Sequence, residues 1–222
     1  MDFQLIFQQI PLFGKALVLT VSLGVAGIFL SLVVGFFVAV SRFFQLPILA
    51  RLGTIYTELS RNTPLLIQLF FLYYGLPKIG ISLEKTTAAV IGLTFLGGSY
   101  MAEAFRGSFQ QVPKVQVEAG KSLGFSRWQL ASQVILPQGL PLAIPSLGAN
   151  AIFLLKETSV FSAISIMDLT NTAKDLIGMY YMTREFLFLL VVSYGVILLP
   201  LILPLHLWER RVRHATGNQD TL

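Results

Sequence analysis

The chain has 222 residues, of which 55% are hydrophobic and only 12% charged, and its mean hydropathy is +0.72. The charged share is about half that of an average soluble domain, so the composition excludes a soluble globular protein and indicates a polytopic, all-α membrane protein. Cysteine is absent, which excludes disulfides and thiolate metal sites, and a net charge of +5 in a membrane chain is more typical of topology signals than of nucleic-acid binding.

The first predicted transmembrane span covers residues 12–40, long enough to cross a bilayer with tilt. Small residues recur along it at three- and four-residue steps, namely Gly24, Gly27, Ser31 and Gly35. Such a stripe predicts close contact with another helix in lipid.

The second predicted span, residues 48–74, is interrupted by polar residues from Tyr56 to Thr63 and by Pro64. Proline removes a helix hydrogen bond and crowds the preceding turn, so a broken helix is expected here. A break and charges at membrane depth are tolerated where they are buried or line a water-filled cavity.

The third predicted span covers residues 86–105, and its end holds Glu103 and Arg106, which share a helix face. We expect these two to form a terminal ion pair rather than a substrate contact. A polar loop, about 107–136, follows. It predicts a helix stopped by Gly124, a short second helix capped by Ser126, and Pro137 in the first turn of the next helix.

The fourth predicted span covers residues 138–155 and ends at Lys156–Ser159. The apolar stretch 160–167 is too short to cross and suits a re-entrant or interfacial segment. The fifth predicted span is 186–207, and a basic tail from Trp208 to His214 follows it; the two histidines of the chain are His206 and His214. The two histidines are not at metal-ligand spacing, so no metal site is expected.

Five spans place the two ends of the chain on opposite sides of the membrane. If the 107–136 loop is cytoplasmic, nine Lys and Arg residues lie inside and six outside. This bias agrees with the positive-inside rule and predicts an outside N-terminus and a cytoplasmic C-terminus. The inside residues are Arg42, Arg51, Arg106, Lys114, Lys121, Arg127, Arg210, Arg211 and Arg213.

The polar loop resembles the EAA loop of bacterial ABC-importer permeases. Glu118, Ala119, Gly124 and Leu136-Pro137 match that pattern in register, whereas Gly120 stands for the second alanine and Val134 for an isoleucine. The resemblance implies that the loop is a cytoplasmic coupling helix that docks on the ATP-binding subunit. Its coupling residues would be Glu118, Ala119, Gly120 and Gly124.

Further motifs extend the resemblance to the permeases of ABC importers for polar amino acids, the group that handles histidine, arginine, lysine, glutamine, glutamate and cystine. These motifs are Arg61-Asn62-Thr63-Pro64, Tyr73-Tyr74-Gly75, Tyr100-Met101-Ala102-Glu103, Leu155-Lys156-Glu157-Thr158-Ser159 and Asp168-Leu169. Asn62 replaces the family's usual glycine, a change that is also compatible with a turn.

The resemblance implies the type I importer permease fold, a single transmembrane domain over residues 1–222 with five helices and the coupling helix between spans three and four. It also implies a multi-pass protein of a bacterial inner or plasma membrane. The implied partners are a second permease, identical or paralogous, a pair of ATP-binding subunits, and an extracytoplasmic solute-binding protein or domain. No cofactor is expected in this chain, because ATP and Mg would be held by the ATPase.

No phosphate-binding loop and no nucleophile–base pair occur in the sequence, so the chain is not expected to be an enzyme. Three alternatives remain beside an amino-acid importer. They are an importer of another small solute, a secondary carrier, and a non-transporting structural subunit. A carrier would normally show two repeated halves, which are not seen here.

The candidate substrate residues lie where the second span breaks and where the fourth ends. They are Glu58, Arg61, Asn62, Thr63, Gln68, Lys156, Glu157 and Ser159. Arg61 can hold a substrate carboxylate with two parallel hydrogen bonds, and Glu58 or Glu157 can receive an ammonium group. The alternative is that Glu58–Arg61 and Lys156–Glu157 are internal ion pairs that hold the bundle together.

Overall fold

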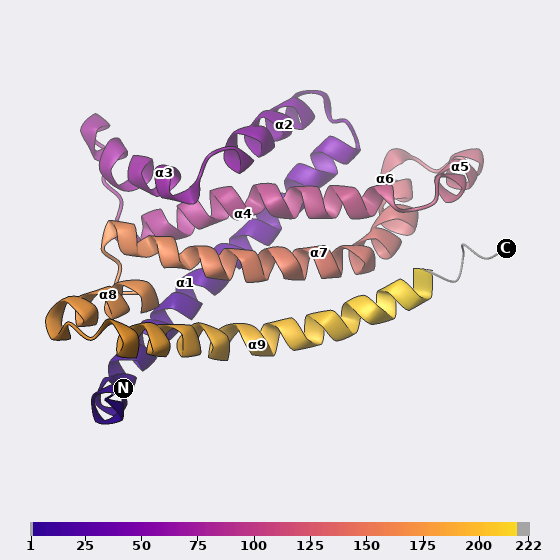
Figure 1. Cartoon of the computed structure of the whole chain (residues 1–222). Helices are drawn as coiled ribbons and strands as arrows, with labels where there is room; N and C mark the ends of the chain where they lie inside the picture. The colour runs from indigo at the N-terminus through magenta and orange to yellow at the C-terminus, as the bar shows by residue number, and fades with distance from the viewer. Residues whose placement is uncertain (1, 217–222) are drawn as a thin grey trace.

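A computed structural model describes the backbone of residues 2–216 and the side chains of residues 2–205. The fold of this part is helical, as predicted (Figure 1). Its α-helices are α1 Phe3–Phe43, α2 Pro47–Arg61, α3 Leu65–Phe70, α4 Lys85–Gln110, α5 Lys114–Ser122, α6 Arg127–Leu130, α7 Leu136–Glu157, α8 Leu169–Tyr180 and α9 Thr183–Thr216. Shorter turns join them, namely π-turns Phe71–Gly75 and Ala131–Ile135 and 3-10 helices Leu76–Ile79 and Thr158–Ile164.

Helix α1 begins well before the predicted span, because Asp2 caps its first turn by accepting a hydrogen bond from the Leu5 N–H at 3.1 Å. It crosses the bundle obliquely and packs mainly against α4 (Figure 1). The predicted stripe of small residues is buried: Gly27, Ser31 and Gly35 face α4, whereas Gly24 faces the end of α7. A Cβ atom on Gly35 would lie 2.5 Å from the Met101 Cβ and 2.8 Å from the Ala102 N, so only glycine permits this approach.

The second predicted span is broken, as expected from Pro64. Helix α2 ends at Arg61, and α3 starts after Pro64 and continues through the π-turn and the 3-10 helix to Ile79. Neither half reaches the about 20 residues that a spanning helix needs. Four helical segments of the described residues are long and apolar enough to cross a membrane, namely Phe3–Phe43, Lys85–Gln110, Arg127–Ile164 and Thr183–Leu205. The count of five spans therefore stays a prediction.

The segment before α7 differs from the expected separate helix. Helix α6 begins at Arg127 as predicted, but the π-turn Ala131–Ile135 connects it to α7 without an intervening loop. Pro137 sits in the first turn of α7, where its missing N–H costs nothing.

The two ends of the bundle carry different parts of the chain. Figure 1 shows the N-terminus of α1 and the helix α8 at one end, and α5, α6 and the C-terminal end of α9 at the other. The side chains of the basic tail and of His206 and His214 lie outside the described residues.

Candidate functional site

The break between α2 and α3 is closed by polar side chains that bond to the backbone. Gln68 lies one turn into α3, and its Nε2 donates to the backbone oxygens of Ser60 at 3.2 Å and Thr63 at 2.9 Å. Asn62 Nδ2 donates to the Glu58 oxygen at 2.7 Å, and Thr63 Oγ1 donates to the Leu59 oxygen at 2.9 Å. Three of the candidate substrate residues thus bond carbonyls at the break, some of which also accept from backbone N–H groups at the end of α2.

The Arg61 guanidinium lies over the Tyr100 ring of α4, with the Cζ atom 5.1 Å from the ring centroid. Such a cation–π contact contributes about 0.5–1 kcal/mol at an exposed site, so it holds the side chain without locking it. Arg61 and Glu58 are both exposed and make no ion pair with each other within the described residues.

Tyr100 connects this break to α7, a link that the sequence analysis misses. Its ring meets that of Phe153 at a centroid distance of 5.1 Å, and its backbone oxygen accepts a hydrogen bond from Asn150 Nδ2 at 3.1 Å. A polar residue inside an apolar span is the signal that could have pointed to this contact, since Asn150 must find a partner in the bundle.

The end of α7 turns into the 3-10 helix η4, Thr158–Ile164, which covers part of the predicted re-entrant or interfacial stretch 160–167. Lys156 at this end is exposed, Glu157 and Ser159 are half-buried, and Lys156 and Glu157 form no ion pair in the described residues. Helix α3 packs against η4. The structure therefore brings the two interruptions side by side, although no hydrogen bond joins the α2 group of candidates to the α7 group.

A different cluster joins α1, α2 and α4 near the polar loop. Glu103 accepts from Arg42 Nη1 at 2.5 Å and from Arg106 Nη2 at 2.7 Å, and Arg42 also donates to Thr57 Oγ1 at 3.2 Å. The predicted Glu103–Arg106 ion pair is confirmed. The Arg42 contact adds a tie between helices 61 residues apart in the chain.

Asp168 caps α8 from a fully buried position between helices. Its Oδ1 accepts from the Asn171 N–H at 2.9 Å, whereas its Oδ2 has no partner among the described residues. Burial raises the pKa of this carboxyl to about 6, although the hydrogen bonds from Asn171 and Thr170 act in the opposite direction. Asp168 lies between two of the membrane-spanning candidates, Arg127–Ile164 and Thr183–Leu205, and not within either.

The predicted coupling residues lie on α5 and on the turn after it. Gly124 has φ +80, its N–H bonds to the Lys121 oxygen, and the Phe125 N–H bonds to the Gly120 oxygen. These two bonds form a Schellman motif, in which a left-handed residue ends the helix and satisfies its last carbonyls. Glu118 and Ala119 lie on the helix that this motif ends, Glu118 facing solvent.

The next helix, α6, packs closely behind this turn. A Cβ atom on Gly120 would lie 2.6 Å from the Leu130 Cδ2, so the glycine at this position allows the two helices to touch. Ser126 and Gln129 form the capping box that starts α6. Val115 on α5 and Leu123 at its end expose 74% and 76% of their surface, and exposed apolar side chains on a polar loop suit a protein partner.

The described residues contain no group of three or more His, Cys, Asp or Glu side chains that could hold a metal ion. The candidate positions offer two cations, two carboxylates, two amides and two hydroxyls. Groups of these kinds suit the binding of a small zwitterion, and no nucleophile held by a base is among them.

Comparison with known proteins identifies the family. Residues 5–216 match the family described as binding-protein-dependent transport system inner membrane component. The chain is 34% identical over 202 residues to the probable amino-acid ABC transporter permease protein PatM of Vibrio harveyi, covering 89% of this chain and 91% of that protein. It is 32% identical over 214 residues to the glutamine transport system permease protein GlnP of Escherichia coli K12, covering 96% and 98%.

Solved structures agree with this family. The crystal structure of an amino acid ABC transporter with histidines superposes with a TM-score of 0.88 at 32% identity, covering 95% of this chain and 99% of that one. The MetNI methionine ABC transporter, in an inward-facing conformation, superposes with a TM-score of 0.72 at 19% identity, covering 90% and 98%, and supports the fold alone. The chain therefore belongs to the binding-protein-dependent transport system inner membrane components, a family of multi-pass permease subunits that are not enzymes and whose ATPase is a separate subunit.

Proposed function

We propose that this chain forms, together with a second permease subunit, the transmembrane pathway of an ABC importer for a polar amino acid. Amino-acid transport is what the names of its relatives state, and the family supplies the general form of the transporter. The transported solute would be delivered by an extracytoplasmic binding protein, and ATP with Mg would be hydrolysed in a pair of partner subunits.

The observation that carries the proposal is the meeting of the two helix interruptions. Helix α3 lies against η4, and Arg61 at the first interruption stacks on Tyr100, whose ring contacts Phe153 on α7. An amino acid needs a cation for its carboxylate and an anion or carbonyls for its ammonium group. We assign Arg61 to the carboxylate and Glu58 or Glu157 to the ammonium, with Lys156 and Ser159 beside them.

The hydrogen bonds of Asn62, Thr63 and Gln68 favour a narrower role for these three candidates. Each uses its side chain to bond a backbone oxygen at the break. We infer that they shape the site by fixing the path of the backbone, and that any contact with substrate comes through the carbonyls nearby.

Transport by the complete reconstituted importer tests the function. Vesicles that hold the permease with its ATPase, supplied with the binding protein and ATP, should accumulate one or a few amino acids from a panel of polar ones. A purified complex without any nucleotide-binding chain, or uptake that does not depend on ATP, would overturn the importer assignment.

Charge-neutralising variants test the site. Arg61→Gln, Glu58→Gln and Lys156→Met should each raise the substrate concentration that half-saturates transport, or change the preferred amino acid, with assembly retained. Arg51→Gln removes a charge from an exposed position of the same helix and should leave both unchanged. Failure of the single variants to assemble, repaired in Glu58→Gln/Arg61→Gln with unchanged preference, would show that the residues are structural.

The proposed orientation, with the N-terminus outside and α5 and the C-terminus in the cytoplasm, can be tested separately. The chain has no cysteine, so Asp2→Cys and Asn218→Cys each introduce a single thiol. An impermeant thiol reagent added to intact cells should label the first and not the second. Labelling of the second alone would invert the orientation and place α5 where no ATPase could reach it.

A further inference from the structure

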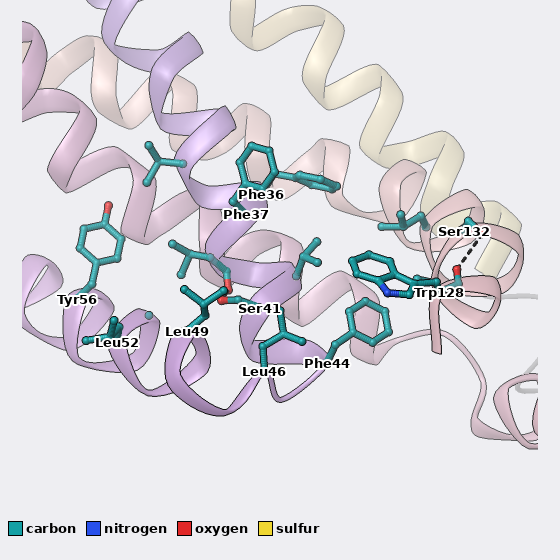
Figure 2. Close-up of a pocket in the computed structure, with 16 residues that line it drawn as sticks. Phe36, Phe37, Ser41, Phe44, Leu46, Leu49, Leu52, Tyr56, Trp128 and Ser132 are labelled. Carbon is teal, nitrogen blue, oxygen red and sulfur yellow. Dashed lines mark hydrogen bonds between the residues drawn. The ribbon is translucent and has the colours of Figure 1, made fainter. Parts of the chain in front are cut away.

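A groove runs between α1 and α2 and ends at α6, at the bundle end that holds α5 (Figure 2). Its volume is 720 Å³. Figure 2 shows Tyr56 towards one end of the groove and Phe44 with Trp128 towards the other, with Leu49 and Leu52 between them. None of the candidate substrate residues lines this groove.

The groove walls suit an apolar occupant, because their polar atoms are already hydrogen-bonded. Tyr56 donates its hydroxyl to the Phe95 oxygen at 2.7 Å, Ser41 donates to the Val38 oxygen at 2.8 Å, and Ser132 donates to the Trp128 oxygen at 2.9 Å. The remaining lining is aliphatic and aromatic. A polar solute would therefore lose its hydration without gaining partners.

The length of the groove matches one leaflet of a bilayer. Helix α2 lines it from Leu46 to Tyr56, and α1 lines it from Val34 to Phe44. Ten residues of helix span about 15 Å, which is half of the hydrocarbon thickness of about 30 Å. A lipid chain that entered at the bundle end would therefore reach the far end of the groove at about the bilayer midplane.

The charges around the groove mouth are positive. The segments that line it, residues 34–56 and 126–136, contain Arg42, Arg51 and Arg127 and no acidic residue. Arg42 is already neutralised by Glu103. Arg127 is exposed next to Trp128 and makes no ion pair in the part of the chain that the structure describes. No side chain caps the N-terminus of α2, which also favours a negative group there.

Trp128 lies towards the end of the groove that we describe as its mouth (Figure 2). It exposes 71% of its surface, and its ring lies 6.5 Å from that of Phe44 between centroids. Tryptophan favours the membrane–water interface, where its ring meets acyl chains and its N–H meets water.

From these features we infer that the groove is a binding site for an anionic phospholipid, with one acyl chain between α1 and α2 and the headgroup phosphate at Arg127. The inference goes beyond transport, because it concerns the lipid face of the subunit and not the solute path. A second protein subunit in the groove is the competing occupant that the experiment must separate.

Quenching of Trp128 by brominated lipid tests the site in the complete transporter. The chain has two tryptophans, so the Trp128 signal is the difference between the Trp208→Phe transporter and the Trp128→Phe/Trp208→Phe transporter. Brominated phosphatidylglycerol should half-quench this signal at about a fivefold lower mole fraction than brominated phosphatidylcholine, as one basic residue near a membrane surface predicts. Arg127→Gln should bring the ratio close to one.

Arg51→Gln is the matched control. By helical geometry of about 100° per residue, Arg51 lies about 160° around α2 from Leu49 and about 140° from Tyr56, so it is turned away from most of the groove lining on this helix. Its loss should leave the fivefold ratio in place. If Arg51→Gln lowers the ratio as much as Arg127→Gln does, the general surface charge attracts the lipid, and the proposed site is wrong.

Two other results would also overturn the inference. Absence of quenching by either lipid would mean that protein covers the groove, and equal quenching by both would mean that the groove does not select an anionic headgroup. If the double tryptophan variant does not assemble, native mass spectrometry can count phosphatidylglycerol bound to the unmodified, Arg127→Gln and Arg51→Gln transporters. The unmodified and Arg51→Gln transporters should retain more phosphatidylglycerol than the Arg127→Gln transporter.

Discussion

The α1–α4 contact and the α2–α3 break solve opposite problems in one bundle. Along α1, Gly27 and Gly35 let two backbones approach until a single added carbon would overlap the neighbour. At the break, helix hydrogen bonds are missing and side chains such as Gln68 replace them. The first region obtains its stability from contact area, and the second from satisfied polar groups. Only the second leaves the charged side chains of Glu58 and Arg61 exposed beside it, and these are the ones that we propose contact the solute.

The largest effect is expected from overfilling the close contact. Gly35→Ala places a Cβ 2.5 Å from the Met101 Cβ and 2.8 Å from a backbone nitrogen, so α1 and α4 must separate. A loss of about 3 kcal/mol is expected, at the upper end for overpacked cores. Thermal unfolding of the purified transporter measures it.

Gly14→Ala is the control on the same helix, because a Cβ there would meet nothing within 4 Å. Replacing a glycine inside a helix normally stabilises it by about 1 kcal/mol. Equal melting temperatures for the two variants would show that the α1–α4 contact is looser than described.

At the break, Gln68→Leu should cost about 1–3 kcal/mol. The substitution keeps a similar volume but leaves the Ser60 and Thr63 oxygens without the donor that now bonds them. Because α3 would lose its anchor to α2, transport should fall more than the amount of assembled protein. Uptake per transporter, measured beside Gln111→Leu, checks this, since Gln111 is exposed and bonds a single carbonyl at 3.4 Å. Normal uptake would limit Gln68 to a minor role.

Asp168 is a buried carboxyl with one oxygen bonded at the start of α8 and the other, like the Gln68 Oε1, without a partner among the described residues. Its pKa is raised from 3.8 to about 6 in the folded protein, so the fold binds more protons than the unfolded chain between these values. Stability is therefore greater below this window and falls as the pH rises through about 6, by roughly 1 kcal/mol between pH 5 and 7.5.

Asp168→Asn tests this pH dependence. Asparagine also caps helices, so the variant keeps the cap of α8 and loses the titration. The difference in melting temperature between pH 5 and pH 7.5 should shrink in the variant, and its stability at pH 7.5 should match or exceed that of the parent. An unchanged difference would assign the pH dependence to another group.

The last prediction concerns Gly124, which lies outside both regions compared above. Gly124→Val forces a branched side chain into a left-handed conformation at a cost of about 1–2 kcal/mol, although nothing within 4 Å would touch its Cβ. Gly124→Asn should be nearly neutral, because asparagine tolerates this conformation. We expect Gly124→Val to lower the ATP-driven uptake rate with normal membrane levels. Equal uptake in the two variants would argue against α5 as the coupling helix.

The features predictable from sequence are those that depend on neighbouring residues. Pro64 predicts the break, Ser126 predicts the start of α6, and the spacing of Gly24 to Gly35 predicts the buried stripe. The Glu103–Arg106 pair follows from a three-residue step on one helix.

Features that require two distant segments are missed. The Arg42–Glu103 pair and the contact of Tyr100 with Phe153 join residues far apart in the chain, and nothing local marks them as partners. The early start of α1 is also missed, since Gln4, Gln8 and Gln9 lower the hydropathy of turns that are nonetheless helical. The roles of the candidate substrate residues depend on contacts of this long-range kind, which is why the sequence leaves two interpretations open.

The unbroken course of α6 into α7 has a mechanical consequence. From Arg127 to Glu157 the chain is one rod with a single widened turn at Ala131–Ile135. Asn150, which holds the Tyr100 backbone, lies about 35 Å along this rod from Arg127, at about 1.5 Å per residue. A sideways push on α6 therefore tilts the part of α7 that touches Tyr100. The π-turn and the two prolines inside α7, Pro141 and Pro145, are the points where the rod can bend, so they set how much of that tilt reaches Tyr100 beneath Arg61.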